Sequence, residues 1–448
     1  MQELLDDAAK RAIRYLAGLD GRGVAPEASA LARLPELDGP LPEQSCDAAQ
    51  TLRLLDEVAS PATMASAGGR FFGFVIGGAL PVALASNWLA TAWDQNAALQ
   101  GPARATSAIE ATALRWLLDL LGLPPHCAGA FVTGATMANF SALAAARHAV
   151  LARVGWSVES DGLFGAPPVT VVIGEEAHPT LVKSLGLLGL GRSRVLRVPV
   201  DGQGRMRADR LPALPAPAIV CLQAGNVNTG ASDPFEDIIA QAHDAGAWVH
   251  VDGAFGLWAA ASRALAPDVA GMVLADSWAT DAHKWLNVPY DSGLAFVRDA
   301  EALRGAMAIS ADYLPVGDAR DPSDFTPELS RRARGVDVWA ALRTLGRTGV
   351  AAMVERCCAH ARRFARELED AGFEILNDVV LNQVLARHGD AGTTQRLIAA
   401  LQADGTCWCG ATSWQGRTAM RISVCSWATT DDDVTRSVAA MRRVASSL

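Results

Sequence analysis

Residues 280–293 read TDAHKWLNVPYDSG, and the lysine at position 284 is unusual for this chain. Of the 39 Lys and Arg residues, only Lys10, Lys183 and Lys284 are lysines. A guanidinium group stays protonated, whereas a lysine amine can lose its proton and bond covalently to a carbonyl group. The stretch therefore predicts that position 284 needs the chemistry of an amine and not only a positive charge.

Upstream of this stretch, from about residue 105, short apolar segments alternate with segments of helical periodicity. Continuous runs of β-branched residues that alternate with helices are typical of a mostly parallel sheet with helices on both faces. We therefore expect an α/β fold. We predict strands within residues 129–134, 168–174, 193–200, 217–225 and 247–256.

Three regions are expected on either side of these patterns. Residues 1–75 alternate helical stretches with connections rich in Pro, Gly and Ala, which is typical of an N-terminal arm that wraps another surface. Residues 76–342 form the large domain that carries the sheet. Residues 343–448 combine an amphipathic helix with short strand-like pieces and a terminal helix, and so predict a smaller α+β domain.

The composition excludes several classes of protein. Hydrophobic residues make up 50% and charged residues 19% of the 448 residues, as expected for a globular protein. The net charge of -9 gives no basic footprint for nucleic acid. The apolar runs are interrupted too often to span a bilayer. The first residues are acidic where a secretory signal is basic, so we expect a cytoplasmic protein.

The eight cysteines have two interpretations. Cys357 and Cys358 are adjacent, and Cys407 and Cys409 form a CWC sequence. No second CxxC and no nearby histidine completes a set of metal ligands, so we expect no metal. We favour ordinary buried thiols over a redox or metal site.

Polar residues follow the predicted strands at the points where each strand ends. They are residues 133–136, His178, Asn226, Asn228 and Asp252. Because ligands of parallel α/β sheets bind at the carboxyl ends of the strands, these residues are expected to converge on one rim.

Each of these residues has a structural and a chemical interpretation. Residues 133–140, TGATMANF, are either a tight turn with a threonine N-cap or a helix N-terminus that binds an anion such as phosphate. Asp252 is either a turn residue or a carboxylate that pairs with a cationic ring nitrogen. His178 is either a polar loop residue or a residue that stacks on a ring.

The order of these elements favours the chemical interpretation. An anion-binding turn, a histidine, an aspartate and then a lysine in an apolar turn are what pyridoxal 5'-phosphate requires. The lysine amine forms an imine with the aldehyde, and the helix N-terminus holds the phosphate. The aspartate keeps the pyridine nitrogen protonated. The alternative is a chance lysine in a loop.

The chain resembles the group II pyridoxal-phosphate-dependent amino acid decarboxylases, the glutamate and aromatic-L-amino-acid decarboxylase-like branch of fold type I. The resemblance extends from RFFGFVIGG, residues 70–78, to AMRISVCS near the C-terminus. Its most specific motif is DAHKWLNVPYDSG, followed by HVDGAFG and then TGATMAN. The resemblance implies a fold-type I PLP-dependent transferase fold, an amino acid substrate and a homodimer with active sites near its interface.

The resemblance also implies a role for each matching residue. Lys284 forms the internal aldimine, and Asp252 pairs with the ring nitrogen. The remaining cofactor contacts are Ala135, Thr136 and His283 at the phosphate, and His178 and Ala254 on the two ring faces, with Asn226 nearby. Arg421 falls where the family binds the substrate carboxylate; its alternative interpretation is a surface arginine on a strand.

This chain departs from the family pattern at two places. Asp281 stands where the family often has Asn. The loop that carries a catalytic tyrosine in relatives is shortened here, with Phe325 at the best-matching position and Tyr313 as the other candidate. Phenylalanine has no proton to give to the carbanion that remains after CO2 leaves.

Three outcomes therefore stay open. The first is decarboxylation of an L-amino acid to an amine. The second is another reaction of the same cofactor, namely oxidative deamination to an aldehyde, transamination or carbon-carbon bond cleavage. The third is a non-catalytic homologue. The residues near Phe71, Phe72, Phe74 and Trp88 line a pocket or pack the core, so the substrate stays open.

Overall fold

The computed structural model describes residues 1–309 and 320–448, and the chain divides into two compact units. One unit consists of Met1–Gly78, His360–Leu376 and Val384–Leu448. The other consists of Ala79–Ala359 and Asn377–Gln383. The N-terminal arm therefore belongs to the same unit as the C-terminal elements. We call this the terminal unit, and the other the sheet unit.

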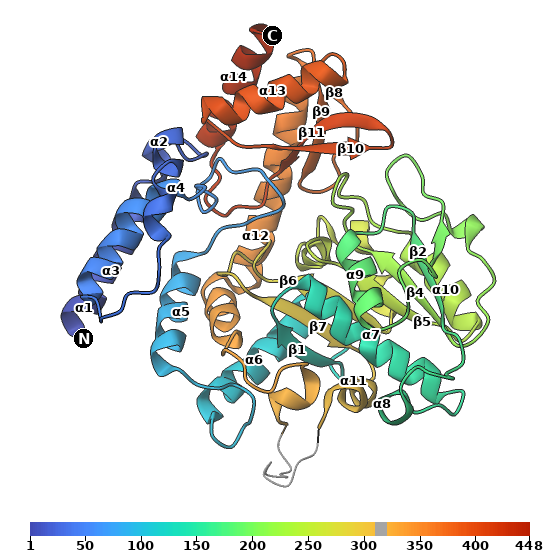
Figure 1. Ribbon diagram of the computed structural model, residues 1–448. Coiled ribbons are helices and arrows are strands. Elements are labelled where there is room, and N and C mark those ends of the chain that lie inside the picture. The colour runs from blue at the N-terminus through green and yellow to red at the C-terminus, as the bar shows by residue number, and fades with distance from the viewer. Residues whose placement is uncertain (310–319) are drawn as a thin grey trace. The chain divides into compact units, whose positions relative to one another are not determined.

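A seven-stranded sheet forms the centre of the sheet unit, with the strand order β1-β7-β6-β5-β4-β2-β3 (Figure 1). Strands β6, β5, β4, β2 and β3 run parallel, and β7 is antiparallel to both of its neighbours. The predicted α/β fold with a mostly parallel sheet is thus confirmed. The strands are β1 (Ala128–Val132), β2 (Thr170–Gly174), β3 (Leu196–Val198), β4 (Ala218–Gln223), β5 (Trp248–Asp252), β6 (Ser277–Asp281) and β7 (Gly293–Val297).

One helix, α7 (Ala135–Ala152), crosses the face of this sheet. It packs against β1, β7, β6, β5 and β4, and α9 and α11 flank it on the same face (Figure 1). This position brings the N-terminus of α7 to the edge where the parallel strands end. The other main helices of this unit are α5 (Pro81–Trp93), α6 (Arg104–Leu120), α9 (Pro179–Leu187), α10 (Phe235–Asp244) and α11 (Ala300–Met307).

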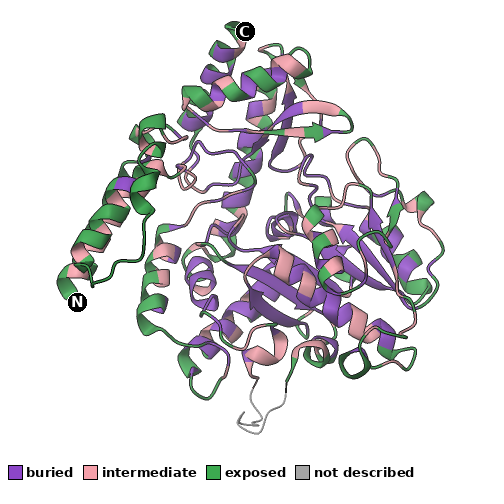
Figure 2. Ribbon diagram, viewed as in Figure 1, coloured by how far each residue is buried: buried purple, intermediate pink, exposed green. Residues whose placement is uncertain are grey.

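The strands of this sheet are almost completely buried, except for Leu196 and Arg197 of the edge strand β3 (Figure 2). Every residue of β1, β5, β6 and β7 is buried. A strand covered on both faces needs apolar or fully hydrogen-bonded residues at each position. The polar residues on β5 and β6 are therefore the ones whose partners need to be found.

The terminal unit contains a four-stranded sheet with the order β10-β11-β9-β8. Residues of the arm bond to its C-terminal part: Phe72 N–H donates to the Trp408 carbonyl at 2.8 Å, and Ser423 N–H donates to the Phe72 carbonyl at 2.9 Å. The elements are α1 (Gln2–Ala17), α2 (Ala28–Leu31), α3 (Ala48–Leu54), α4 (Ser60–Ala62), β8 (Glu374–Ile375), β9 (Gln383–Arg387), α13 (Ala391–Asp404), β10 (Gly410–Trp414), β11 (Arg417–Ser423) and α14 (Asp431–Ser446).

Helix α12 (Gly335–Glu369) contributes residues to both units. Gly346 interrupts it with φ 59° and ψ -179°, a conformation that glycine tolerates far better than other residues. The helix is therefore two helical segments joined at Gly346. None of the helices within residues 1–309 and 320–448 has the length and apolar character that crossing a bilayer requires.

Candidate active site

Two strands end and one helix begins at the carboxyl edge of the sheet. Strand β5 ends at Asp252, β6 ends at Asp281, and α7 begins at Ala135 just after β1. Asp252 pairs in register with Ala279, two residues before Asp281. The two carboxylates therefore stand at the ends of neighbouring parallel strands, which is the usual ligand position of such a sheet.

Lys284 lies in the loop between β6 and β7. Its Nζ is 3.0 Å from Asp281 Oδ2, and 22% of its side chain is exposed. The next two residues, Trp285 and Leu286, are completely buried. The loop closes on itself because the Ser292 carbonyl accepts hydrogen bonds from the N–H groups of residues 282 and 283. A buried loop thus presents one partly exposed amine beside a carboxylate.

Asp252 is only 4% exposed, and hydrogen bonds fix both oxygens of its carboxylate. Asn139 Nδ2 donates to Oδ2 at 3.1 Å, and the Ala254 N–H donates to Oδ1 at 3.2 Å. Burial raises the pKa of Asp252, while the electrostatic effects of His178 and Lys284 and these hydrogen bonds oppose that rise. Asp252 is therefore a desolvated and oriented carboxylate.

The N-terminus of α7 lies against the Lys284 loop. The Ala135 N–H donates to Asp281 Oδ1 at 2.5 Å, and His283 Nε2 is 3.5 Å from the same oxygen. Burial lowers the pKa of His283, whose Nδ1 accepts a hydrogen bond from the Ser292 N–H at 3.1 Å. The structure thus brings Ala135 and His283 together around an acidic oxygen, and Thr136 follows as the second residue of the helix.

His178 and Ala254 flank this edge. His178 caps α9, and its Nδ1 accepts a hydrogen bond from the Thr180 N–H at 3.3 Å. The electrostatic effect of His178 lowers the pKa of Asp252. The carbonyl of Ala254 accepts a hydrogen bond from the Asp281 N–H at 2.9 Å, so Ala254 connects the ends of β5 and β6 through its backbone.

Asn226 and Phe325 have structural contacts of their own. The side-chain oxygen of Asn226 accepts hydrogen bonds from the N–H groups of Asn228 and Thr229 and so holds the turn after β4. Phe325 lies in a short helix, Pro322–Phe325, with the guanidinium carbon of Arg320 4.3 Å from its ring centre. The ring also packs against the core cluster that α7 and α11 share. A role for either residue in the reaction stays a prediction.

The positions of two other predicted residues relative to this edge stay untested. Tyr313 lies outside the described residues. Arg421 lies on β11 of the terminal unit, where burial lowers the pKa of its guanidinium group. Its role as the partner of the substrate carboxylate stays a prediction.

The sequence interpretation missed Asn139 and His250. Both side chains are completely buried, and Asn139 donates to Asp252. A signal was present in the sequence, because Trp248, His250 and Asp252 alternate with valines along β5 and so share one face of the strand. A histidine on a buried strand needs hydrogen-bond partners, which pointed to a polar network at this face.

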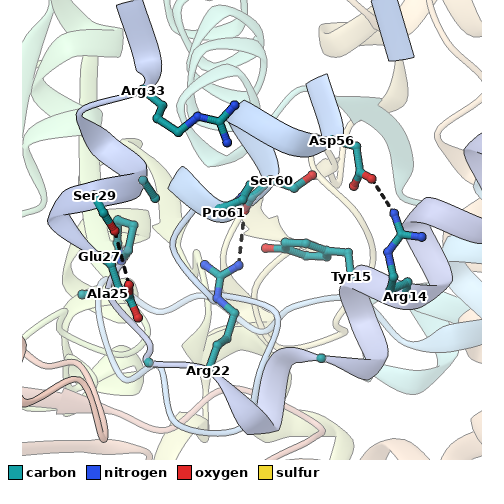
Figure 3. Close-up of a pocket in the computed structure, with 14 residues that line it drawn as sticks. Arg14, Tyr15, Arg22, Ala25, Glu27, Ser29, Arg33, Asp56, Ser60 and Pro61 are labelled. Atoms are coloured by element: carbon teal, nitrogen blue, oxygen red, sulfur yellow. Dashed lines mark hydrogen bonds and ion pairs between the residues drawn. The ribbon is translucent and has the colours of Figure 1, made fainter. Parts of the chain in front are cut away.

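A pocket of about 590 Å³ lies elsewhere, in the N-terminal segment of the terminal unit (Figure 3). Its three arginines already have partners. Arg14 contacts Asp56, Arg22 donates to the Ser60 carbonyl, and Arg33 contacts Glu36. None of the predicted site residues lines this pocket among the residues that the structure describes. We therefore assign the candidate site to the sheet edge.

The residues at the sheet edge fit pyridoxal 5'-phosphate. Lys284 supplies the amine, the N-terminus of α7 supplies N–H groups for a phosphate, and Asp252 supplies a buried carboxylate for a ring nitrogen. The close approach of His283 supports the phosphate position: a Cβ built on Gly134 would lie 3.2 Å from His283 Cε1. The one unusual feature is Asp281, whose oxygen already accepts from the Ala135 N–H.

The fold and this site define a class of enzymes that hold an aldehyde cofactor on a lysine at the carboxyl edge of a sheet. Residues 40–388 match the family model described as the pyridoxal-dependent decarboxylase conserved domain. The chain therefore belongs to the pyridoxal-dependent decarboxylase family.

Curated relatives are similar over part of their length. The chain is 29% identical to the aromatic-L-amino-acid decarboxylase of Bacillus atrophaeus over 251 residues, which cover 53% of this chain and 50% of the relative. It is 28% identical to tryptophan decarboxylase 1 of Oryza sativa subsp. japonica, with 69% of this chain and 65% of the relative covered. The chain thus spans about half to two thirds of the length of these relatives.

Solved structures share the fold over the whole chain. The crystal structure of Oryza sativa TDC with PLP and tryptamine has a TM-score of 0.92 at 23% identity, with 100% of this chain and 97% of that chain covered. The crystal structure of mouse CSAD has a TM-score of 0.91 at 22% identity, with 99% and 98% covered. At such identities the likeness establishes the fold.

Proposed function

We propose that the protein is a pyridoxal 5'-phosphate-dependent decarboxylase that converts an L-amino acid into an amine and CO2. The observation that carries this proposal is the grouping of the Lys284 amine, the buried Asp252 carboxylate and the N-terminus of α7 at one edge of the sheet. Membership of the pyridoxal-dependent decarboxylase family supports it.

Each residue of the site has a proposed part in this function. Lys284 holds the cofactor covalently, and Asp252 accepts a hydrogen bond from the protonated ring nitrogen. When bound, the cofactor supplies an electron sink for the electron pair that remains when CO2 leaves. His178 and Ala254 enclose the ring. The N–H groups of residues 135 and 136, together with His283, hold the phosphate.

The experiment that tests this proposal is incubation of the purified, cofactor-loaded protein with a panel of L-amino acids. We expect CO2 and the corresponding amine in equal amounts from at least one substrate, and neither product from Lys284→Ala. Transfer of the amino group without CO2 release from any substrate in the panel would contradict the decarboxylase assignment.

A second candidate function is oxidative deamination coupled to decarboxylation, which gives an aldehyde. Phe325 motivates it, because this residue best matches the position of the family loop tyrosine and cannot donate a proton. In that case each turnover consumes one O2 and one water and releases CO2, ammonia and hydrogen peroxide along with the aldehyde. A clean amine product whose formation does not depend on oxygen would exclude this candidate.

We further propose that the protein is a homodimer in the cytoplasm. Three large apolar residues of α5, Trp88, Leu89 and Trp93, are 43%, 56% and 42% exposed, which indicates a surface that a second subunit covers. All eight cysteines are thiols, which supports a reducing compartment.

A further inference from the structure

A buried chain of hydrogen bonds leads from the interior of the sheet to Asp252. Trp248 Nε1 donates to Ser277 Oγ at 2.9 Å, and Ser277 Oγ is 3.0 Å from His250 Nδ1. His250 Nε2 is 2.8 Å from Asn139 Oδ1, and Asn139 Nδ2 donates to Asp252 Oδ2 at 3.1 Å. The first four side chains are at most 1% exposed. We call Ser277, His250 and Asn139 the relay.

The chemistry of these groups determines which atom donates in each hydrogen bond of the relay. An indole N–H can only donate, so Ser277 Oγ accepts from Trp248 and its own proton is available for His250 Nδ1. Burial lowers the pKa of His250 to about 3, so its ring is neutral and carries one proton. That proton is then on Nε2 and points to Asn139 Oδ1. Every donor in the relay therefore points toward Asp252.

Reversing the relay is unfavourable while Asp252 is charged. If the Asn139 amide turned over, its oxygen would face the Asp252 carboxylate and its NH2 group would face His250. Two acceptors would then lie in contact in a desolvated place, where an unmade hydrogen bond costs most. The neutral Nε2–H form of His250 thus supports the amide orientation that donates to a charged Asp252.

We propose that Asn139 and His250 are positioning residues that hold Asp252 as an oriented carboxylate for the ring nitrogen of the cofactor. This proposal rests on the proposed function. The other groups that interact electrostatically with Asp252 are His178 and Lys284, and Asp252 in turn raises the pKa of the buried Cys221 thiol. The relay residues are separate from these groups, so substitutions in the relay leave all three groups in place.

The test compares two substitutions at His250. In His250→Gln the new amide NH2 can still donate to Asn139, whereas His250→Leu has no donor. We expect His250→Leu to weaken binding of pyridoxal 5'-phosphate to the apo-protein about tenfold, since a charge-assisted hydrogen bond contributes about that factor. We also expect the pH midpoint of the visible cofactor band to rise by about one unit, because a less positive ring nitrogen makes the imine at Lys284 easier to protonate. His250→Gln should stay close to wild type in both measurements.

A matched control separates this effect from loss of packing. Trp278→Phe removes another completely buried hydrogen bond in β6, from Trp278 Nε1 to the Met272 carbonyl, which has no link to Asp252. It should lower the melting temperature without moving the cofactor band. For His250→Leu we expect a fall in kcat of more than tenfold with KM changed less than twofold, because an ordered electron sink acts on the reaction and not on substrate binding.

The inference is wrong if folded His250→Leu matches Trp278→Phe in cofactor affinity and in the pH midpoint of the band. If His250→Leu does not fold, Ser277→Ala serves instead: it should shift the midpoint in the same direction by a smaller amount, and no shift would overturn the inference. Wild-type protein that binds no pyridoxal 5'-phosphate would instead refute the proposed function, so the two failures are distinguishable.

Discussion

Asp281 is the residue whose charge most distinguishes this site. Its carboxylate lies 3.0 Å from Lys284 Nζ and accepts from the Ala135 N–H, where a phosphate would bind. The amine has to leave this ion pair before it can bond to the aldehyde of the cofactor. We therefore predict that Asp281→Asn takes up pyridoxal 5'-phosphate several-fold faster and binds it more tightly, as measured by absorbance after mixing with apo-protein.

Asp291→Asn is the control for this prediction, because Asp291 lies in the same loop and pairs with Arg334. It removes one negative charge from the loop without altering the partner of Lys284. Slower or weaker cofactor uptake in Asp281→Asn than in Asp291→Asn would show that Asp281 helps to hold the cofactor.

For single residues, the sequence was informative where a residue type is rare in the chain or where a residue directly follows a predicted strand. Lys284 stood out among three lysines, and Asp252 and the turn before α7 followed predicted strands. Asn139 and His250 were missed because their importance depends on contacts with residues about 110 positions apart in the chain. Local sequence patterns do not show which residues of α7 face which residues of β5.

The backbone of β7 lies in direct contact with the backbone of the turn before α7. A Cβ added at Gly293 would lie 2.4 Å from Gly134 Cα, so a side chain there forces one backbone away from the other. We predict that Gly293→Ala lowers the free energy of unfolding by about 1–3 kcal/mol and weakens cofactor binding. Urea denaturation and cofactor titration measure the two effects.

Gly101→Ala is the matched control, because an added Cβ at Gly101 has no atom within 4 Å. It should leave both quantities nearly unchanged. Equal stability and equal cofactor affinity of the two variants would contradict the assigned role of the Gly134–Gly293 contact in placing the helix N-terminus.

The sequence predicted elements well where their pattern was local. Strands β2, β4 and β5 and the helices between them lie where the alternation of apolar runs placed them. Strands β6 and β7 were not predicted. Residues 277–281, SWATD, contain polar residues that become acceptable in a buried strand only through partners elsewhere, such as Trp248 for Ser277 and Ala135 for Asp281.

For the molecule as a whole, the exposed apolar residues of α5 predict a homodimer. Leu89→Glu places a charge on this surface and should shift the protein toward monomer in sedimentation velocity, because an unpaired charge in an interface is costly. Leu187→Glu on α9 is the control, since Leu187 is also 56% exposed. Wild-type protein that sediments as a monomer would contradict this prediction.

The stability of the folded molecule should depend on pH through Asp337. Burial raises the pKa of Asp337 to about 6, so the folded state favours its neutral form. The stability that this residue contributes is present below about pH 4 and is lost as the pH rises through 6. Asp337→Asn should therefore be more stable than wild type at pH 8, by on the order of 2–3 kcal/mol, with little gain at pH 4.

Thermal unfolding of both proteins at the two pH values checks this prediction. Asp119→Asn is the control, because the Asp119 side chain is 76% exposed and forms only a surface ion pair with Arg347. A gain for Asp337→Asn that is the same at pH 4 and pH 8 would show that the Asp337 charge is not its source.

The central claim is that the amine of Lys284 carries the cofactor, and the scarcity of lysine makes it directly measurable. Purified protein loaded with pyridoxal 5'-phosphate is reduced with borohydride, digested and analysed by mass spectrometry. The account predicts a reduced pyridoxal phosphate adduct on the peptide that contains Lys284 and none on those with Lys10 or Lys183. An unmodified Lys284, or an adduct on either of the other two lysines alone, would contradict it.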